Sequence, residues 1–238
     1  MLVTGSSHTT MIDTENRISI QVGLSGYSFK IQADGSMHSS GWMSAERVFN
    51  TQELQKRYDD VEISVFTPKF ALVPAGFHTP ENSRQLLEEV TAVSEEDVVD
   101  YIEVPQLAAV MVYSLSVGGT LPKVLAETVL KTDGTKAKPM PEACAMLNQL
   151  NEIKDYNKIL ASYMDGYLYL VVAQGKSLLL CNSYMAPDFT TAQYFIFLAL
   201  KKLQLNPEMS TLFFRTPLED EQELSLYRYF RSVERLDR

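Results

Sequence analysis

Residues with the spacing that catalysis or metal binding requires are scarce in this sequence of 238 residues. The three histidines (His8, His38 and His78) are isolated and show no ligand spacing, so we interpret them as surface or turn residues. The two cysteines, Cys144 and Cys181, lack a CxxC partner, which favours reduced thiols, with a single disulfide as the alternative. Neither a Gly-x-x-x-x-Gly-Lys phosphate loop nor a Gly-x-Ser-x-Gly nucleophile elbow is present. The sequence therefore predicts no catalytic residue and no metal site.

The charge balance argues against some classes of partner. The chain has 30 acidic and 21 basic residues, a formal net charge of −9. An acidic surface repels phosphate backbones, so we expect no nucleic-acid partner. The longest apolar stretch, Ala192–Leu200, is too short to span a bilayer, and no basic or strongly apolar leader opens the sequence. We therefore expect a cytoplasmic protein with no membrane insertion.

The elements that must position any site are two sets of strands. Each half of the sequence has three apolar segments separated by glycine turns, which predicts two three-stranded antiparallel meanders. The segments are 18–22, 27–31 and 37–43 in the first half and 159–164, 167–172 and 177–183 in the second. The turns are Ser25-Gly26, Asp34-Gly35, Asp165-Gly166 and Gln174-Gly175. Helices are predicted after each meander, including one capped by Asp188 and one that a capping box starts at Thr216.

A self-match at an offset of 140 residues links the two halves. Gly26 and Tyr27 match Gly166 and Tyr167, although any two meanders share glycine turns. The same order of elements after each meander favours a duplication. Three antiparallel strands followed by alternating helices and strands describe a ribonuclease H-like unit. The predicted fold is therefore α/β, with two tandem ribonuclease H-like units, each a mixed sheet that starts with the meander. We expect a flexible tail over residues 1–16, a first lobe over 17–153 and a second lobe over 154–238.

Three segments carry a resemblance to a known family. Arg17–Phe29, Thr67–Pro74 and Asp165–Val172 resemble an uncharacterised bacterial family of unknown function with an actin-like ATPase fold. The resemblance implies two tandem lobes, as the repeat does. Its motifs are structural, so it implies no established activity.

The actin-like fold implies where a phosphate site would lie. In such ATPases the amides of two hairpin turns cradle the phosphates, and an Asp-x-Gly carboxylate in each turn holds hydrated Mg²⁺. The resemblance thus makes two turns the candidate cofactor-binding residues on the phosphate side. They are Ser25, Gly26, Asp165 and Gly166.

The acids that such a site needs are missing from their expected positions. The aspartate positions fall on Leu24 and Met164. Asp165 comes one residue late, so we expect it to point to the other face of its strand and to form an ordinary hairpin turn. This pattern predicts no hydrolysis of ATP.

Two functions of different classes remain. The first is a non-enzymatic protein-interaction or regulatory protein on a degenerate actin-like scaffold, with an unidentified protein partner and no cofactor. The alternative is a nucleotide-binding ATPase or kinase-like protein, with ATP and Mg²⁺ in the interlobe cleft between diverged phosphate loops. The last predicted helix is the candidate contact surface, because Tyr229 is expected to be exposed beside Arg228 and Arg231. The residues expected to face inward are Leu218, Leu224, Tyr227 and Phe230.

Overall fold

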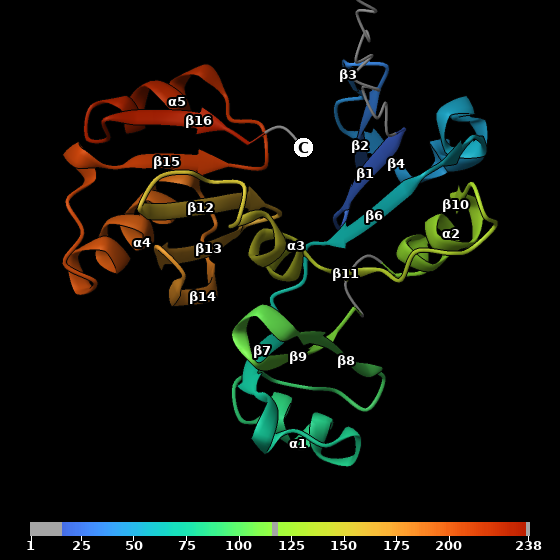
Figure 1. Cartoon of the computed structure of the whole chain (residues 1–238), viewed down its shortest axis with the longest axis horizontal. Helices are drawn as coiled ribbons and strands as arrows, with labels where there is room; N and C mark the ends of the chain where they lie inside the picture. The colour runs from blue at the N-terminus through green and yellow to red at the C-terminus, as the bar shows by residue number, and fades with distance from the viewer. Residues whose placement is uncertain (1–15, 116–118, 237–238) are drawn as a thin grey trace, which may run out of the picture.

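The first sheet forms around the first predicted meander. The computed structural model describes residues 16–115 and 119–236, so the predicted tail, apart from Asn16, lies outside the described residues (Figure 1). The strands of this sheet are β1 (Arg17–Val22), β2 (Gly26–Ala33), β3 (Ser36–Ser39), β4 (Met43–Ser44), β6 (Asp60–Val65) and β11 (Met140–Pro141). β1 pairs antiparallel with β2 and parallel with β6, giving the order β11-β6-β1-β2-β3 with β4 also on β2. A separate two-stranded pair joins β5 (Arg57–Tyr58) to β10 (Leu130–Lys131).

The second sheet repeats this topology. Its strands are β12 (Asn157–Met164), β13 (Tyr167–Gln174), β14 (Ser177–Met185), β15 (Thr211–Phe214) and β16 (Ser232–Arg235). Their order, β16-β15-β12-β13-β14, corresponds strand for strand to β11-β6-β1-β2-β3. β12 is antiparallel to β13 and parallel to β15, as β1 is to β2 and β6. The predicted pair of mixed sheets, each opening with an antiparallel meander, is thus confirmed.

A third sheet lies within the range assigned to the first lobe. It has the order β7-β9-β8, with strands β7 (Phe70–Pro74), β8 (Val99–Val104) and β9 (Ala109–Ser114). All residues of β9 are buried, as its continuous apolar sequence predicts, and α1 (Ser83–Glu88) packs on these strands. The sequence predicts strands at 70–73 and 107–115, which correspond to β7 and β9, but it predicts neither β8 nor the separation of this sheet from the first. Figure 1 shows this unit apart from both large sheets.

Helices of the second lobe pack on its sheet, and one of their boundaries differs from the prediction. In α4 (Phe189–Lys202) the side chain of Asp188 accepts a hydrogen bond from the Thr191 amide, which confirms the predicted cap. α5 (Asp220–Tyr227) is capped by Glu219 instead of Thr216, because the Thr216 hydroxyl accepts a hydrogen bond from the Tyr163 amide.

The inward face of α5 also differs from the prediction. Phe230 is buried and Leu218 partly buried, as expected, but Leu224 is 64% exposed and Tyr227 is 47% exposed. Leu226 is the buried residue of the helix. Leu218 precedes the helix and Phe230 follows its end, so neither residue sets the phase of its inward face.

One helix joins the three units. α3 (Glu142–Gln149) is buried on nearly all sides and contacts both β6 of the first sheet and β13 of the second (Figure 1). Its core cluster includes Tyr113 from the third sheet and Tyr169 from the second. α2 (Leu121–Thr128) instead packs on the first sheet. No helix within the described ranges is long and apolar enough to cross a bilayer.

Candidate functional site between the two hairpin turns

The two predicted phosphate-side turns meet in the structure. The first connects β1 to β2 and the second connects β12 to β13, so each comes from a different lobe. The Leu24 backbone amide donates a hydrogen bond of 2.7 Å to Oδ2 of Asp165. A contact across 141 residues of sequence thus brings Ser25-Gly26 and Asp165-Gly166 to one place.

The second turn has the geometry of a two-residue hairpin. Asp165 and Gly166 have φ values of 53° and 75°, the combination that tight hairpins with right-twisted strands require. Asp tolerates this conformation and Gly adopts it without strain. The Ala186 amide then donates to the Gly166 carbonyl oxygen at 2.7 Å, which ties the turn to the end of β14. Asp165 is a turn residue, as predicted, but its carboxylate also reaches the other lobe.

The first turn is held by a close approach of backbone to backbone. The Gly23 amide donates to the Gly26 carbonyl oxygen at 2.9 Å and closes the turn. A Cβ on Gly26, whose φ is 156°, would lie 1.9 Å from the Met43 carbonyl oxygen of β4. Gly26 therefore has a structural reason to be glycine that is independent of any ligand.

Trp42 completes the site, and the sequence analysis did not identify it. Its Nε1 donates a hydrogen bond of 3.1 Å to the Ser25 hydroxyl. A Cβ on Gly23 would lie 2.4 Å from Oδ2 of Asp165 and 3.1 Å from the Trp42 ring, so both side chains lie against Gly23. Trp42 is the only tryptophan of the chain, which is the signal that could have drawn attention to it.

The positions where an ATPase would carry its two acids have apolar side chains here. Leu24 is 62% exposed at the tip of the first turn, and Met164 is partly buried at the end of β12. Among the residues that the structure describes, no group of three or more histidine, cysteine or acidic side chains is arranged to hold a metal ion. Asp165 is the only acid of the two turns.

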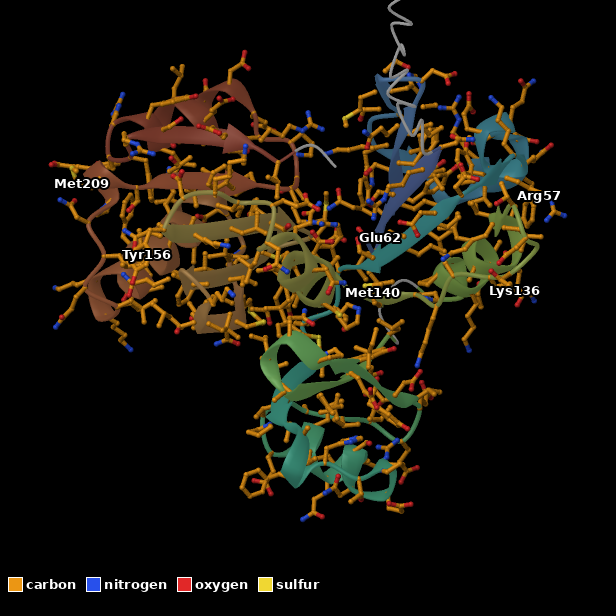
Figure 2. The ribbon with its side chains drawn as sticks, viewed as in Figure 1. Arg57, Glu62, Lys136, Met140, Tyr156 and Met209 are labelled. Carbon is orange, nitrogen blue, oxygen red and sulfur yellow. The ribbon has the colours of Figure 1, made fainter. Side chains whose placement is uncertain are left out.

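A buried charge cluster lies between the lobes. Arg215, which follows β15, donates from Nε to Oε1 of Glu142 at 2.8 Å and from Nη2 to Oε1 of Glu62 at 3.2 Å. Arg215 is 4% exposed and Glu142 is fully buried. Burial alone would lower the pKa of Arg215, but the two glutamates outweigh burial and hold it above its ordinary value. Figure 2 shows Glu62 on the side of the first sheet that faces the second lobe.

Neutral side chains from both lobes complete the cluster. The Gln21 amide and the Ser162 hydroxyl donate to Oε1 of Glu142 at 3.0 Å and 2.7 Å. The Ser19 hydroxyl donates to Glu62 at 3.1 Å. Glu142 also begins α3, where a carboxylate is favoured by the helix dipole. Two carboxylates and one guanidinium give the cluster a formal charge of −1.

A small cavity adjoins the cluster. It measures about 10 Å³ and is lined in part by Ser19, Gln21, Gln149 and Arg215. Arg215 Nη1, a donor, and Gln149 Oε1, an acceptor, have no hydrogen-bond partner among the described residues. A cavity of this size is at the lower limit for one water molecule.

The charge cluster was not predicted, although its sequence carries a signal. Glu62 lies in a strand between Val61 and Ile63, and Arg215 follows two phenylalanines. Charged residues inside apolar segments are rarely buried unless they are paired. The pattern therefore indicates a buried ion pair, but it does not identify the partners.

Both cysteines are free thiols in the structure. Burial, and to a lesser extent Glu62, raises the pKa of Cys144 to about 11. Burial, with a smaller contribution from Cys144, raises the pKa of Cys181 to about 12. Both thiols are therefore neutral at physiological pH, which does not suit a nucleophile.

Comparisons with known proteins agree with the fold. The sequence pattern of DUF3822, a family of proteins of unknown function, matches residues 6–233. The chain belongs to this family. No curated protein matches the DUF3822 chain.

Two solved structures are similar to the DUF3822 protein over nearly its whole length. One is a Bacteroides thetaiotaomicron protein with an actin-like ATPase fold and unknown function, 17% identical, covering 95% of this chain and 94% of that one, with a TM-score of 0.66. The other is from the PilM–PilN type IV pilus biogenesis complex, 15% identical, covering 93% and 88%, with a TM-score of 0.51. The DUF3822 protein thus has an actin-like ATPase fold, as the resemblance implied.

Proposed function

We propose that the DUF3822 protein acts by binding another protein and not by turnover of a nucleotide. One observation carries the proposal: the carboxylate of Asp165 accepts the Leu24 amide of the opposite turn. In the actin-like fold, the turn amides are the groups that would bind phosphate oxygens. In this chain a side chain of the protein already occupies one of them.

Electrostatics at the turns supports the same proposal. A phosphate oxygen that approached the Leu24 amide would have to displace the carboxylate of Asp165, which lies 2.7 Å from the amide nitrogen. Two anions cannot share one donor without strong repulsion. Leu24 and Met164 supply no second carboxylate that would help to hold a compensating Mg²⁺.

The packing between the lobes adds a steric argument. The cavity beside the Glu62–Glu142–Arg215 cluster measures about 10 Å³. Sites for cofactor-sized ligands measure roughly 300–1,000 Å³. A nucleotide at this position would therefore require the lobes to separate and the buried charges to lose their partners.

A precedent exists for an actin-like protein in a complex with another protein. PilM, whose fold is similar, forms a type IV pilus biogenesis complex with PilN. At 15% identity this likeness concerns the fold alone. It therefore supports a protein partner for the DUF3822 protein but does not identify that partner as PilN.

Titration with ATP and Mg²⁺ tests the proposal. We expect no saturable heat in calorimetry and no change in Trp42 fluorescence at millimolar nucleotide. Trp42 is the only tryptophan and bonds to the first turn, so its emission reports on the site directly. An active actin-like ATPase measured in parallel is the positive control. Saturable binding, or hydrolysis that an Asp165→Asn variant abolishes, would overturn the proposal.

The second candidate is a nucleotide-binding protein with diverged phosphate loops. The observation that favours it is the meeting of the two turns, which brings Ser25, Gly26, Asp165 and Gly166 together as a phosphate site would require. In that case a phosphate would take the Leu24 amide and Asp165 would turn to hydrated Mg²⁺. A change in Trp42 emission that needs both ATP and Mg²⁺ would favour this candidate.

A further inference from the structure

The second lobe carries aromatic and cationic side chains side by side on its helices α4 and α5. We call this the α4–α5 surface and define it by Tyr194, Phe197, Lys201, Arg228 and Tyr229. Residues 194, 197 and 201 are three and four positions apart in α4, so they share one face of that helix. The Tyr229 ring packs edge-on against Phe197, with ring centroids 5.0 Å apart. This ring contact joins α5 to that face of α4, and Arg228 precedes Tyr229 in the chain.

Contacts other than the Tyr229–Phe197 pair also hold the two helices beside each other. Gln193 of α4 donates a hydrogen bond to the Ser225 hydroxyl of α5. Phe197 also stacks on Phe230, and Phe230 and Leu226 are buried in the core of the lobe. The core is therefore complete without the outward rings. Tyr194 is 60% exposed and Tyr229 is 53% exposed.

The cations of this surface lie toward the C-terminal ends of the two helices, whereas the first turn of α5 is acidic, with Asp220, Glu221 and Glu223. The whole chain has a formal charge of −9. Lys201 and Arg228 are nevertheless exposed here, and no ion pair involves them within the described ranges. Arg231 is a third cation nearby, which pairs with Asp155 at 3.1 Å. A cationic, aromatic face on an acidic protein complements an acidic ligand that has an apolar anchor.

We propose that the α4–α5 surface binds an acidic segment of a partner protein through an aromatic or aliphatic anchor residue. The inference rests on the proposed function and adds the place and the chemistry of the contact. Tyr and Arg are the side chains that most often dominate binding energy at protein interfaces. The exposed aromatic rings suit the anchor, and Lys201 and Arg228, which have no ion pair among the described residues, suit the flanking acids. Because the chain is acidic overall, a long polyanion such as nucleic acid fits it less well than a short acidic segment.

The surface lies at a distance from the interlobe site. The backbone amide of Arg231 donates to the carbonyl oxygens of Pro207 and Ser210, which places the end of α5 beside the loop of Met209. Figure 2 shows Met209 at the outer end of the second lobe, away from the first sheet. A partner bound here would therefore leave the hairpin turns uncovered.

Selection from a library of displayed random peptides on the immobilised full chain tests the proposal. We expect the enriched peptides to carry several acidic residues around one aromatic or leucine residue. A synthetic copy of an enriched peptide, labelled for fluorescence polarisation, should bind the wild type at least tenfold more tightly than Tyr229→Ala or the double variant Lys201→Glu/Arg228→Glu. Matched controls elsewhere are Phe77→Ala, which truncates an exposed aromatic ring, and Lys123→Glu, which reverses an exposed lysine. Both should bind as the wild type does.

Three outcomes would overturn the proposal: no enrichment, enriched peptides without an acidic excess, or binding that the surface variants leave unchanged. Competition by single-stranded DNA with the same dependence on Lys201 and Arg228 would also overturn it, in favour of a nucleic-acid ligand. Thermal denaturation should show that the double variant folds, because its two side chains are exposed, even if Tyr229→Ala loses stability with its contact to Phe197. Peptides that bind elsewhere would reject this surface alone, whereas ATP binding would reject the proposed function.

Discussion

Asp165 has two structural roles. It occupies a left-handed position in the second hairpin turn, with φ 53°, and its carboxylate accepts the amide of the first turn. The first role depends on the short polar side chain of aspartate, which asparagine shares. The second depends on its charge, because a charge-assisted hydrogen bond is stronger than a neutral one. Substitutions can therefore separate the two roles.

An Asp165→Asn variant should keep the turn and weaken the contact between the lobes. We expect a loss of about 1 kcal/mol in the free energy of unfolding, since the hydrogen bond is partly exposed to solvent. Trp42 emission should shift, because Trp42 and Asp165 both lie against Gly23. Urea unfolding followed by fluorescence measures both effects. Asp165→Gly is the companion variant, since it removes the acceptor and also relieves the positive φ. Unchanged emission in both variants would contradict the contact.

At the residue level the sequence predicted where the turns lie but not what they touch. Glycine and aspartate in a hairpin follow from local backbone conformation, which a short segment determines. The hydrogen bond from Leu24 to Asp165, and the ion pairs of Arg215 with Glu62 and Glu142, depend on how two distant lobes pack. Local patterns do not contain that information.

Among the elements, the pairing of β2 with β4 depends on one glycine. A Cβ on Gly26 would lie 1.9 Å from the Met43 carbonyl oxygen, and its φ of 156° is one that other residues rarely adopt. Gly26→Ala should therefore cost about 3 kcal/mol or more, because backbone has to move. Gly35→Ala is the matched control, since a Cβ there meets nothing within 4 Å and only its φ of 72° is unfavourable. We expect it to cost about 1 kcal/mol. Equal losses in chemical denaturation would show that steric contact with β4 is unimportant.

The element predictions succeeded where glycine turns separated the strands and failed where competing caps existed. Apolar segments separated by glycine turns predicted the strands of both meanders, although β1 and β13 are buried on both faces. The predicted start of α5 was wrong because Thr216 and Glu219 are each followed three residues later by a side chain that can complete a capping box, and only tertiary contacts decide between them. β16, which pairs parallel with β15, was not predicted, because its four residues show little periodicity.

For the whole molecule, Arg215 links three segments that are distant in the sequence. Arg215→Met should destabilise the protein by about 3–5 kcal/mol, since it leaves Glu62 and Glu142 buried without their counter-charge. Arg231→Met is a control of the same chemistry, because the Arg231–Asp155 pair is largely exposed and should contribute less than about 1 kcal/mol. Chemical denaturation measures both variants. A loss below about 1 kcal/mol for Arg215→Met would indicate that the cluster does not stabilise the packing of the lobes.

The duplication was the part of the architecture that the sequence predicted best. β1 begins at Arg17 and β12 at Asn157, as the offset of 140 residues requires, and both sheets have the same strand order. The third sheet could not be inferred from the sequence. β7 follows β6 after only four residues, so the pattern indicates one continuous first lobe. Whether two neighbouring strands share a sheet is decided by packing and not by the pattern within either strand.

The space around Gly23 has a consequence for how this family can change over time. A methyl group at position 23 would lie 2.4 Å from the Asp165 carboxylate, although the two residues belong to different lobes. No side chain can be accepted at position 23 while Asp165 remains in this contact. If Asp165 is replaced by a smaller residue, a side chain can be accepted at position 23. If Gly23 is replaced first, the Asp165 carboxylate has to move away. We therefore expect positions 23 and 165, one in each lobe, to vary together among members of the family.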